Sequence, residues 1–405
     1  MEFFLIDKSR RFTYADLVDA INRKQEYYPL FKNKDLFPYF VNLLSALASN
    51  QPLVLLDADL NSDEIEDVKE RDVNVAFPLE PCHYNSAEEI VKAILHSSSE
   101  ITIFTSGTTG QPKKVVHTIS SLTRFLRTGN CYEEQTWAYA YNPTHMAGLQ
   151  VFFQAFANGN TLINVFNFSR SEIYRLIHEF QVTHISATPT FYRLLLPCES
   201  AYPSVVRVTL GGERSESQLY DSIKKIFPMA KINNIYASTE AGSLFVAQGD
   251  CFRIPEAIRN KIRVEEDELF IHKSLLGKSE HFQLIGDYYP SGDLVEWQDD
   301  ERNTFKFKSR KNELINIGGY KVNPGEVESA LLSIAGISQV RVYGRSNSVL
   351  GNILCAEVRL EPSSVLEEVE IRNQLKDCLQ DFKIPRYFKF VETLSLTRTG
   401  KLKRL

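Results

Sequence analysis

The sequence predicts an α/β protein with a large N-terminal domain and a small C-terminal domain. Its 405 residues exceed what one hydrophobic core usually fills, so two or more domains are expected. In the longer part, short buried-strand patterns alternate with apolar helix patterns, which is typical of parallel sheets sandwiched between helices. The last ~95 residues have the order strand, helix, strands, helix and strand, which predicts a separate small α/β domain. We therefore expect domains at residues 1–309 and 310–405.

The composition is that of an ordinary globular protein, with 43% hydrophobic and 24% charged residues. A net charge of -5 provides no field for holding nucleic acid or an anionic membrane, so an anionic ligand needs a local site. The six cysteines are widely separated and form no C-x-x-C pair, which predicts free thiols in a reducing compartment. Neither a membrane-spanning run nor a signal peptide is recognisable, so we expect a cytoplasmic protein.

The first predicted elements form one unit of a parallel sheet. Thr13 precedes apolar residues at helical spacing, which predicts a helix over residues 13–21. Leu36–Ala48 is expected to be an apolar helix, and Pro52–Asp57 a buried strand.

A loop rich in glycine and hydroxyl groups follows between two predicted strands, Ile101–Phe104 and Val115–Val116. Its glycines let the loop turn back with several backbone N–H groups pointing into one concavity, while the hydroxyls and lysine add donors and positive charge. Such a loop suits a polyphosphate, although its spacing fits neither the Walker pattern nor G-x-G-x-x-G. A polar hairpin that binds nothing is the alternative. The loop residues are Thr105, Ser106, Gly107, Thr108, Thr109, Gly110 and Lys113.

A predicted strand, Trp137–Tyr141, leads through Asn142 and His145 to a predicted helix, Gln150–Ala157. Side chains at such a crossing lie at the mouth of a sheet, where ligands usually bind. From spacing alone, His145 is more often a satisfied structural residue than a functional one.

His178 and His184 superficially resemble the zinc motif H-E-x-x-H. They are six residues apart, about 120° from each other on a helix, so they cannot share a metal there. We expect a helix end followed by a strand.

Further strands end in chemically distinctive residues. Val205–Leu210 is followed by Gly211, Gly212 and Glu213, where absent side chains let a planar ligand approach the backbone. Glu240 stands beside the Thr239 hydroxyl, a combination that suits a Mg²⁺ ion bridging phosphates. An unpaired glutamate is otherwise usually a solvated surface residue.

The loop T-S-G-T-T-G-Q-P-K at residues 105–113 resembles the phosphate loop of the adenylate-forming superfamily, which contains acyl- and aryl-CoA ligases, amino-acid adenylation domains and luciferases. The run over residues 143–163 is similar to that of the o-succinylbenzoate:CoA ligase branch. Four more segments match family motifs in the right order: Tyr236–Glu240, Tyr288–Leu294, Arg310–Glu328 and Thr397–Lys401. The chain is therefore identified as a member of this superfamily, and the C-terminal domain is expected to be a mobile lid hinged at Asn312.

The resemblance implies a reaction and its ligands. ATP, with Mg²⁺, activates a small carboxylic acid as an acyl-AMP, which then passes to the thiol of CoA or to the phosphopantetheine of an acyl carrier protein. The catalytic candidates are Lys401, Thr239, Glu240 and His145, with Glu240 holding the metal. The phosphate loop, Gly211, Gly212, Glu213, Asn234 and Tyr236 are expected around the nucleotide, Asp293 and Arg310 at the ribose, and Gly318 and Gly319 in the thiol-transfer step.

The chain also departs from the family pattern. Lys114, Ala237, Asn312 and Leu396 replace usual residues, and only about a hundred residues precede the phosphate loop, so a shortened N-terminal portion is expected. A degenerate member that binds or stabilises other proteins is therefore an alternative to an enzyme.

The predicted acid pocket is small to medium in size and apolar, favouring an aryl or medium acyl acid. Its candidates are His145, Met146, Gly211, Gly212 and Ala237. We expect a monomer or homodimer without nucleic-acid partners.

Overall fold

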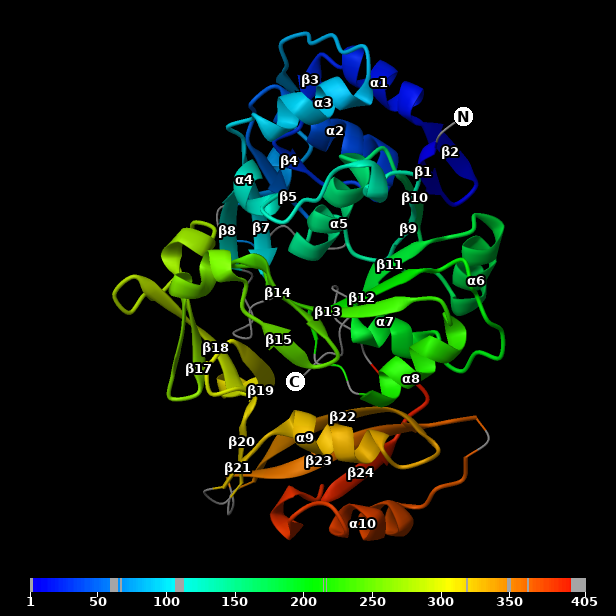
Figure 1. The fold of residues 1–405 in the computed structure, drawn as a ribbon, viewed down its shortest axis with the longest axis vertical. Coiled ribbons are helices and arrows are strands. Elements are labelled where there is room, and N and C mark those ends of the chain that lie inside the picture. The colour runs from blue at the N-terminus through cyan, green and yellow to red at the C-terminus, as the bar shows by residue number, and fades with distance from the viewer. Residues whose placement is uncertain are drawn as a thin grey trace.

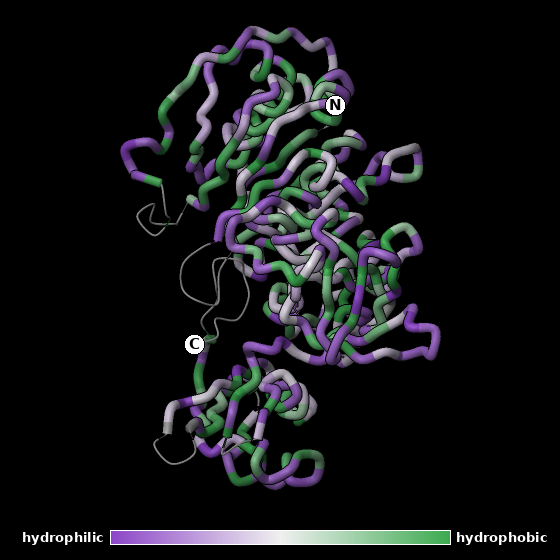
Figure 2. Tube along the Cα trace, turned by 90° about the vertical axis from the view of Figure 1, so that its left-hand side faces the viewer, coloured by the Kyte–Doolittle hydropathy of each residue, from purple (hydrophilic) through white to green (hydrophobic). Residues whose placement is uncertain are grey.

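The computed structural model describes residues 3–58, 65, 68–105, 113–213, 215, 217–317, 320–347, 351–362 and 364–394. A large α/β body occupies most of the molecule, and a smaller C-terminal body lies below it in Figure 1. Figure 2 shows hydrophobic stretches inside both bodies. The α/β prediction with a small second domain is confirmed.

The main sheet has thirteen strands and two different halves. In the first half, six neighbouring strands run parallel, as predicted, with one antiparallel strand at the edge. The parallel strands are β1 (Phe3–Asp7), β10 (Thr161–Asn164), β9 (Thr136–Tyr139), β11 (His184–Ala187), β12 (Arg207–Gly211) and β13 (Lys231–Ser238), and the edge strand is β2 (Arg10–Thr13).

The second half of the sheet is antiparallel. It contains, in sheet order, β14 (Gly242–Gln248), β15 (Cys251–Arg253), β19 (Thr304–Arg310), β18 (Tyr288–Trp297), β17 (Glu268–His272) and β16 (Ile262–Glu265). The alternation of aromatic and basic residues over Phe305–Lys308 is typical of an exposed strand, but the strand is not exposed at Phe305. Phe305 is fully buried against Phe245 and Phe252, because β19 lies inside the sheet between β15 and β18.

Helices cover the two faces of the parallel half (Figure 1). On one face, α5 (Met146–Phe156) packs on Tyr139 and Tyr141, and on the other α6 (Arg170–Glu179), α7 (Pro189–Leu194) and α8 (Ser217–Ile226) pack on Ala138 and Val208. Helix α5 begins at Met146, four residues before the predicted start. Gly148 permits this close packing, since a Cβ there would lie 2.2 Å from the Asn142 carbonyl oxygen.

A second sheet carries the predicted loop. Its strands are β4 (Leu30–Phe31), β5 (Leu53–Leu55), β7 (Glu100–Thr105) and β8 (Lys113–Thr118). Around it lie α1 (Tyr14–Asn22), α2 (Leu36–Ala48), α3 (Ala87–Leu95), α4 (Ile119–Leu122) and the strand pair β3 (Glu26–Tyr27) and β6 (Phe77–Pro78). The predicted cap is present: the Thr13 hydroxyl accepts from the Asp16 N–H, and the Asp16 carboxylate accepts from Thr13.

The chain leaves the main sheet after Arg310, the last residue of β19. The C-terminal body has a core of its own that includes Val327, Leu331, Val340, Val358 and Ile371. It consists of the hairpin β20 (Ile315–Ile317) and β21 (Tyr320–Val322), the sheet of β22 (Ile337–Asn347), β23 (Gly351–Leu360) and β24 (Tyr387–Phe390), and the helices α9 (Pro324–Leu332) and α10 (Glu368–Lys376).

Two compositional predictions bear on the whole chain. All six cysteines are free thiols, as expected. Within the described residues, every helix is too short or too polar to cross a bilayer.

Candidate active site

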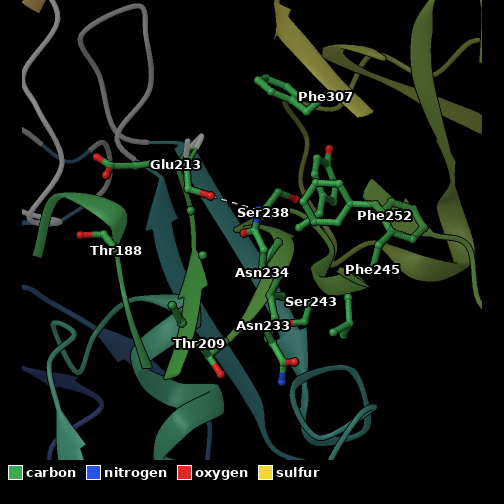
Figure 3. Close-up of a pocket in the computed structure, with 18 of the residues that line it drawn as sticks. Thr188, Thr209, Glu213, Asn233, Asn234, Ser238, Ser243, Phe245, Phe252 and Phe307 are labelled. Carbon is green, nitrogen blue, oxygen red and sulfur yellow. Dashed lines mark hydrogen bonds between the residues drawn. The ribbon is translucent and has the colours of Figure 1, made fainter. Parts of the chain in front are cut away.

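A large cleft of about 2370 Å³ opens where the parallel strands end. Its walls come from the ends of β11, β12 and β13, from β14, β18 and β19, and from α9 of the C-terminal body. The cleft continues beneath α5 toward the beginnings of the same strands. Figure 3 shows part of its lining, with Thr209 and Asn233 on one side and the aromatic residues Phe245, Phe252 and Phe307 on the other.

Asp293 and Arg310, predicted to bind a ribose, lie side by side on β18 and β19. They are cross-strand partners, and the Arg310 Nε donates to Asp293 Oδ1 over 2.9 Å. The Tyr236 hydroxyl donates to the other carboxylate oxygen. Asp293 is only 3% exposed, so both of its oxygens are held in place. The carboxylate raises the pKa of Arg310, while burial and the same carboxylate raise that of Tyr236, so the Asp293–Arg310 ion pair and a protonated Tyr236 hydroxyl persist at neutral pH.

A second carboxylate supports this arrangement. Glu268, 7% exposed, accepts from the Gly292 N–H over 3.0 Å and from Lys311 Nζ over 2.8 Å. Gly292 has φ of +75°, a conformation that glycine adopts without strain. Glu268 thus fixes the turn that carries Asp293. It also links this turn to Lys311, which precedes the proposed hinge residue Asn312.

Thr239 and Glu240 are held through their backbones. His117 on β8 donates from Nε2 to the Thr239 carbonyl over 2.8 Å, and its Nδ1 lies 3.0 Å from the Ser121 Oγ. The Gly277 N–H donates to the Glu240 carbonyl over 2.8 Å. Burial, with a smaller contribution from the charge of Arg124 and against the hydrogen bond to Thr239, lowers the pKa of His117 to about 4, so this imidazole is neutral at physiological pH. Sequence reasoning missed His117 because its partner is 122 residues away.

The Glu240 side chain lines the cleft without a hydrogen bond or ion pair to another described residue. A carboxylate left uncommitted by the protein is a suitable oxygen ligand for Mg²⁺. Burial raises the pKa of Tyr289 to about 12, and the negative charge of Glu240 contributes. Lys113 is exposed and lines the same cleft, paired across the hairpin with the backbone of Thr105. Among the described residues, no cluster of three or more side chains forms a preformed metal site.

The glycines after β12 shape the wall of the cleft. Gly212 has φ of +81°, and a Cβ at Gly211 would lie 3.4 Å from the Ile235 carbonyl oxygen. Glu213 accepts from the Thr190 N–H over 2.9 Å and from its hydroxyl over 2.7 Å, so it ties β12 to α7. The two glycines and Glu213 lie at the same end of the cleft as the other described nucleotide candidates. Figure 3 shows Glu213 near Thr188.

Asn234, another nucleotide candidate, is 5% exposed and donates from Nδ2 to Ser215 Oγ over 3.3 Å. The Tyr220 hydroxyl lies 3.4 Å from the same nitrogen. These bonds fix the amide next to Tyr236.

His145 stands directly before α5. Its Nε2 is buried, makes no hydrogen bond and lies 3.9 Å from Asp57 Oδ2, an oxygen that accepts from Asn142 Nδ2 over 2.8 Å. His145 and Met146 both line the cleft, so the structure brings these two predicted pocket residues to the site. His178 and His184, by contrast, lie on α6 and β11, as the sequence predicted.

Several predicted site residues lie outside the described part of the chain. They are Ser106, Gly107, Thr108, Thr109, Gly110, Gly318, Gly319 and Lys401, and of Thr105 only the backbone is described. Their roles stay predictions from the sequence.

The apolar acid pocket stays a prediction from the sequence. Beneath α5 the cleft is lined by Ser186, Thr209 and Asn233, and by Arg207 at its far end. The alternation of residues along each parallel strand could have indicated that one face is polar. Only the strand register shows that the polar side chains of the three strands share one face.

The family model of the AMP-binding enzymes matches residues 41–263, more than half of the 405-residue chain. The chain belongs to the AMP-binding enzyme family. The model of the AMP-binding enzyme C-terminal domain matches residues 326–401, in the small body.

Curated relatives of this family member are distant. Tyrocidine synthase 3 of Brevibacillus parabrevis is 27% identical over 75% of this chain and 5% of that protein. The uncharacterized acyl-CoA ligase YtcI of Bacillus subtilis and the 2-succinylbenzoate–CoA ligase of Staphylococcus aureus are each 26% identical over 75% of this chain, which spans 64% and 65% of their lengths.

Solved structures share the fold. The o-succinylbenzoate CoA synthetase (MenE) of Bacillus subtilis, in complex with the acyl-adenylate OSB-AMP, matches with a TM-score of 0.72 and 21% identity. ATP-bound MatB of Rhodopseudomonas palustris matches with a TM-score of 0.74 and 15% identity. Each alignment covers 99% of this chain and 94% of the other.

Proposed function

We propose that this AMP-binding enzyme is an ATP-dependent carboxylic acid:thiol ligase. In the first half-reaction, a carboxylate oxygen attacks the α-phosphorus of ATP, and the bond to the β-phosphate oxygen breaks, giving acyl-AMP and pyrophosphate. In the second, a thiol attacks the acyl carbon and AMP leaves. The observation that supports this most is the pairing of Asp293 with Arg310 and Tyr236, opposite the uncommitted Glu240 across one cleft.

The chain's residues contribute positioning and charge. Asp293 can accept from the ribose hydroxyls through the lone pairs that Arg310 and Tyr236 leave open. Glu240 would hold Mg²⁺, which supplies positive charge at the ATP phosphates, and Lys113 with the loop before it would bind the β- and γ-phosphates. We assign Lys401 to the substrate carboxylate oxygen and the α-phosphate, where it would stabilise the negative charge of the transition state.

The domain boundary and the acceptor are part of the same proposal. We place the boundary at Arg310, after which the chain leaves the main sheet, with Asn312 as the hinge. CoA is the preferred acceptor, because the chain spans 64% and 65% of two relatives that are named CoA ligases, against 5% of tyrocidine synthase 3. The phosphopantetheine of a carrier protein is the second candidate, since the tyrocidine synthase similarity covers the same share of the chain. The free thiols fit a reducing cytoplasm.

The test is hydroxamate and pyrophosphate formation from ATP, Mg²⁺ and a panel of aryl, aliphatic and dicarboxylic acids in hydroxylamine. Hydroxylamine captures the acyl group of an acyl-AMP without requiring the natural thiol. We expect both products with at least one acid. Failure of every acid, with ATP bound, would favour the degenerate, non-catalytic alternative.

Lys401→Ala separates the two half-reactions. We expect hydroxamate formation to fall on the order of a hundred- to thousandfold, because one preorganised charge is lost at the transition state. Transfer of a supplied acyl-AMP to CoA should continue. Equal losses in both half-reactions would contradict the role given to Lys401, and Lys114→Ala, next to the phosphate loop, serves as a control for general loss of positive charge.

A further inference from the structure

The part of the cleft beneath α5 is polar along its floor. Strand alternation places Thr209 and Arg207 on the opposite face of β12 from the buried Val208 and Leu210. This face looks toward α5, and both residues line the cleft. This floor adds polar groups to a cleft in which the sequence predicted an apolar acid pocket.

The register aligns these polar residues in rows across neighbouring strands. In the first row, Thr209 lies between Ser186 of β11 and Asn233 of β13. Neither the Thr209 hydroxyl nor the Asn233 amide makes a side-chain hydrogen bond to another described residue. Figure 3 shows the two side chains together at one end of the cleft.

In the second row, two residues toward the strand starts, Arg207 lies beside His184. The His184 ring stacks on Trp137 with centroids 4.8 Å apart, and its Nδ1 lies 2.9 Å from the Thr183 hydroxyl. Burial and, to a smaller extent, the charge of Arg207 together lower the pKa of His184 to about 4, so this imidazole is neutral. Positive charge in this row of the cleft thus comes from Arg207.

Arg207 is half-buried and has no ion pair with a carboxylate among the described residues. Asp250, a carboxylate near the start of β13, is paired with Lys306 over 3.2 Å. Glu213, Glu240 and Asp293 lie at the other end of the cleft, where the strands finish. A guanidinium in a partly buried channel without a protein anion is suited to a ligand anion.

The distance between Gly211 and Arg207 along β12 sets the length of the ligand that would fit. Gly211 marks the end of the cleft where the carboxylate would be activated, and Arg207 lies four residues earlier on β12. Four residues of strand span about 13 Å, so, allowing for the length of the arginine, the two anionic ends of a ligand would be separated by on the order of 10 Å.

We propose that the acid substrate is a dicarboxylate whose second carboxylate binds Arg207, while its middle part passes Thr209 and Asn233. This inference rests on the proposed function. An apolar acid of the same length would cover Arg207, Thr209 and Asn233 without giving them partners, and leaving polar groups desolvated and unpaired is costly. The same argument gives selectivity, because a site built for hydrogen bonds rejects the analogue that lacks them.

The experiment compares α,ω-dicarboxylic acids of increasing chain length with monocarboxylic acids of equal carbon number. We expect kcat/KM for hydroxamate formation to favour the best diacid over its monoacid about ten- to a hundredfold. Arg207→Gln should abolish this preference by lowering kcat/KM for the diacid alone. Arg207→Lys, which keeps the charge but not the planar fork, should keep part of it.

Lys231→Gln is the matched control. Lys231 is the register partner of Arg207 on β13 and carries the same charge, but it is exposed and does not line the cleft. We expect the preference for diacids to be unchanged in this variant. An equal loss in Lys231→Gln and Arg207→Gln would show that only general surface charge matters and would overturn the proposal.

Binding measured without catalysis separates this inference from the proposed function. Calorimetric titration of the full chain with the same diacids and monoacids should show tighter diacid binding that Arg207→Gln removes. Tighter binding of diacids without any hydroxamate formation would contradict the ligase proposal but would still support the diacid site. Equal binding of diacids and monoacids, or an Arg207→Gln variant that behaves as the wild type, would overturn the diacid site whatever the catalytic result.

Discussion

The two ends of the cleft differ in whether their charged groups have hydrogen-bonding partners within the protein. At the end proposed to bind the ribose, called the ribose end below, Asp293 is held by Arg310 and Tyr236, and the turn that carries it is held by Glu268. At the distal end, Arg207, Thr209 and Asn233 have no hydrogen-bonding side-chain partner within the described chain. Both ends lie on strands of the same sheet.

The contrast indicates which ligand each end is built for. A group that the protein has already paired is fixed in direction before the ligand arrives, which reduces the entropy lost on binding. A group without a partner gains most of its stabilisation from the ligand itself, so it discriminates strongly between ligands that satisfy it and those that do not. The first arrangement suits a constant ligand such as a nucleotide, and the second suits the variable acid.

Asp293→Asn should weaken ATP binding at the ribose end, and we expect it to have the largest effect of these variants. The amide keeps the shape but not the charge, so Arg310 loses its ion-pair partner and the ribose loses a charged acceptor. We expect the KM for ATP to rise about ten- to a hundredfold while the KM for the acid stays nearly constant. Pyrophosphate release at varied ATP and varied acid measures both.

Asp250→Asn is the control for this change, because it breaks an exposed ion pair, with Lys306, elsewhere in the cleft wall. Both KM values should stay within about twofold. If Asp293→Asn instead raised both KM values equally, the separation of the two ends would be refuted.

The double variant Thr209→Val and Asn233→Leu should change the acid preference of the distal end without abolishing activity. It replaces two unpartnered polar groups by apolar ones, so covering the floor no longer desolvates them. We expect kcat/KM for monocarboxylic acids to rise by roughly tenfold, at an unchanged KM for ATP. A fall for monocarboxylic acids, with ATP binding intact, would show that the floor needs its polar groups for a different reason.

His117→Gln tests the support of Thr239 and Glu240 through pH. The pKa of His117 in the folded protein is about 4, below the ordinary value of about 6.5, so the unfolded chain binds more protons between these values. The free energy of unfolding therefore rises with pH through this window, and His117 contributes about 2 kcal/mol of the loss between pH 6.5 and pH 5. His184, with a pKa also about 4, adds a similar slope.

We expect the wild type to lose roughly twice as much unfolding free energy as His117→Gln when the pH is lowered from 6.5 to 5, as measured by urea denaturation. His178→Gln, at an exposed position on α6, is the control and should lose as much as the wild type. Identical pH slopes in the wild type and His117→Gln would contradict a neutral, buried His117.

Local features of the fold could be predicted from the sequence. Thr13 with Asp16 three residues later marks a helix start, and helix α2 has the predicted bounds, because capping and periodicity act over a few residues. Asp293 and Arg310 were predicted in one site from motifs, and the antiparallel pairing of their strands brings them together.

The remaining features depend on contacts that no local pattern contains. His117 meets Thr239 because β8 packs beside the turn after β13, and Phe305 is buried because β19 pairs with strands on both sides. The polar floor depends on how β11, β12 and β13 are aligned, since a shift of one residue would turn Arg207 and Thr209 to the other face. The predicted phosphate loop and Lys401 lie outside the described residues and are not part of this comparison.

The aligned rows beneath α5 have a consequence for how such proteins diversify. Successive rows are two residues apart along the strands, so each row lies about 6.6 Å further than the row before it from the end of the cleft proposed for the nucleotide. If Arg207 binds the second carboxylate as proposed, the pair of substitutions Arg207→Thr and Thr209→Arg would shorten the accepted acid by about 6.6 Å. On this proposal, two substitutions on β12 change the accepted acid length without any change at Asp293 or Arg310.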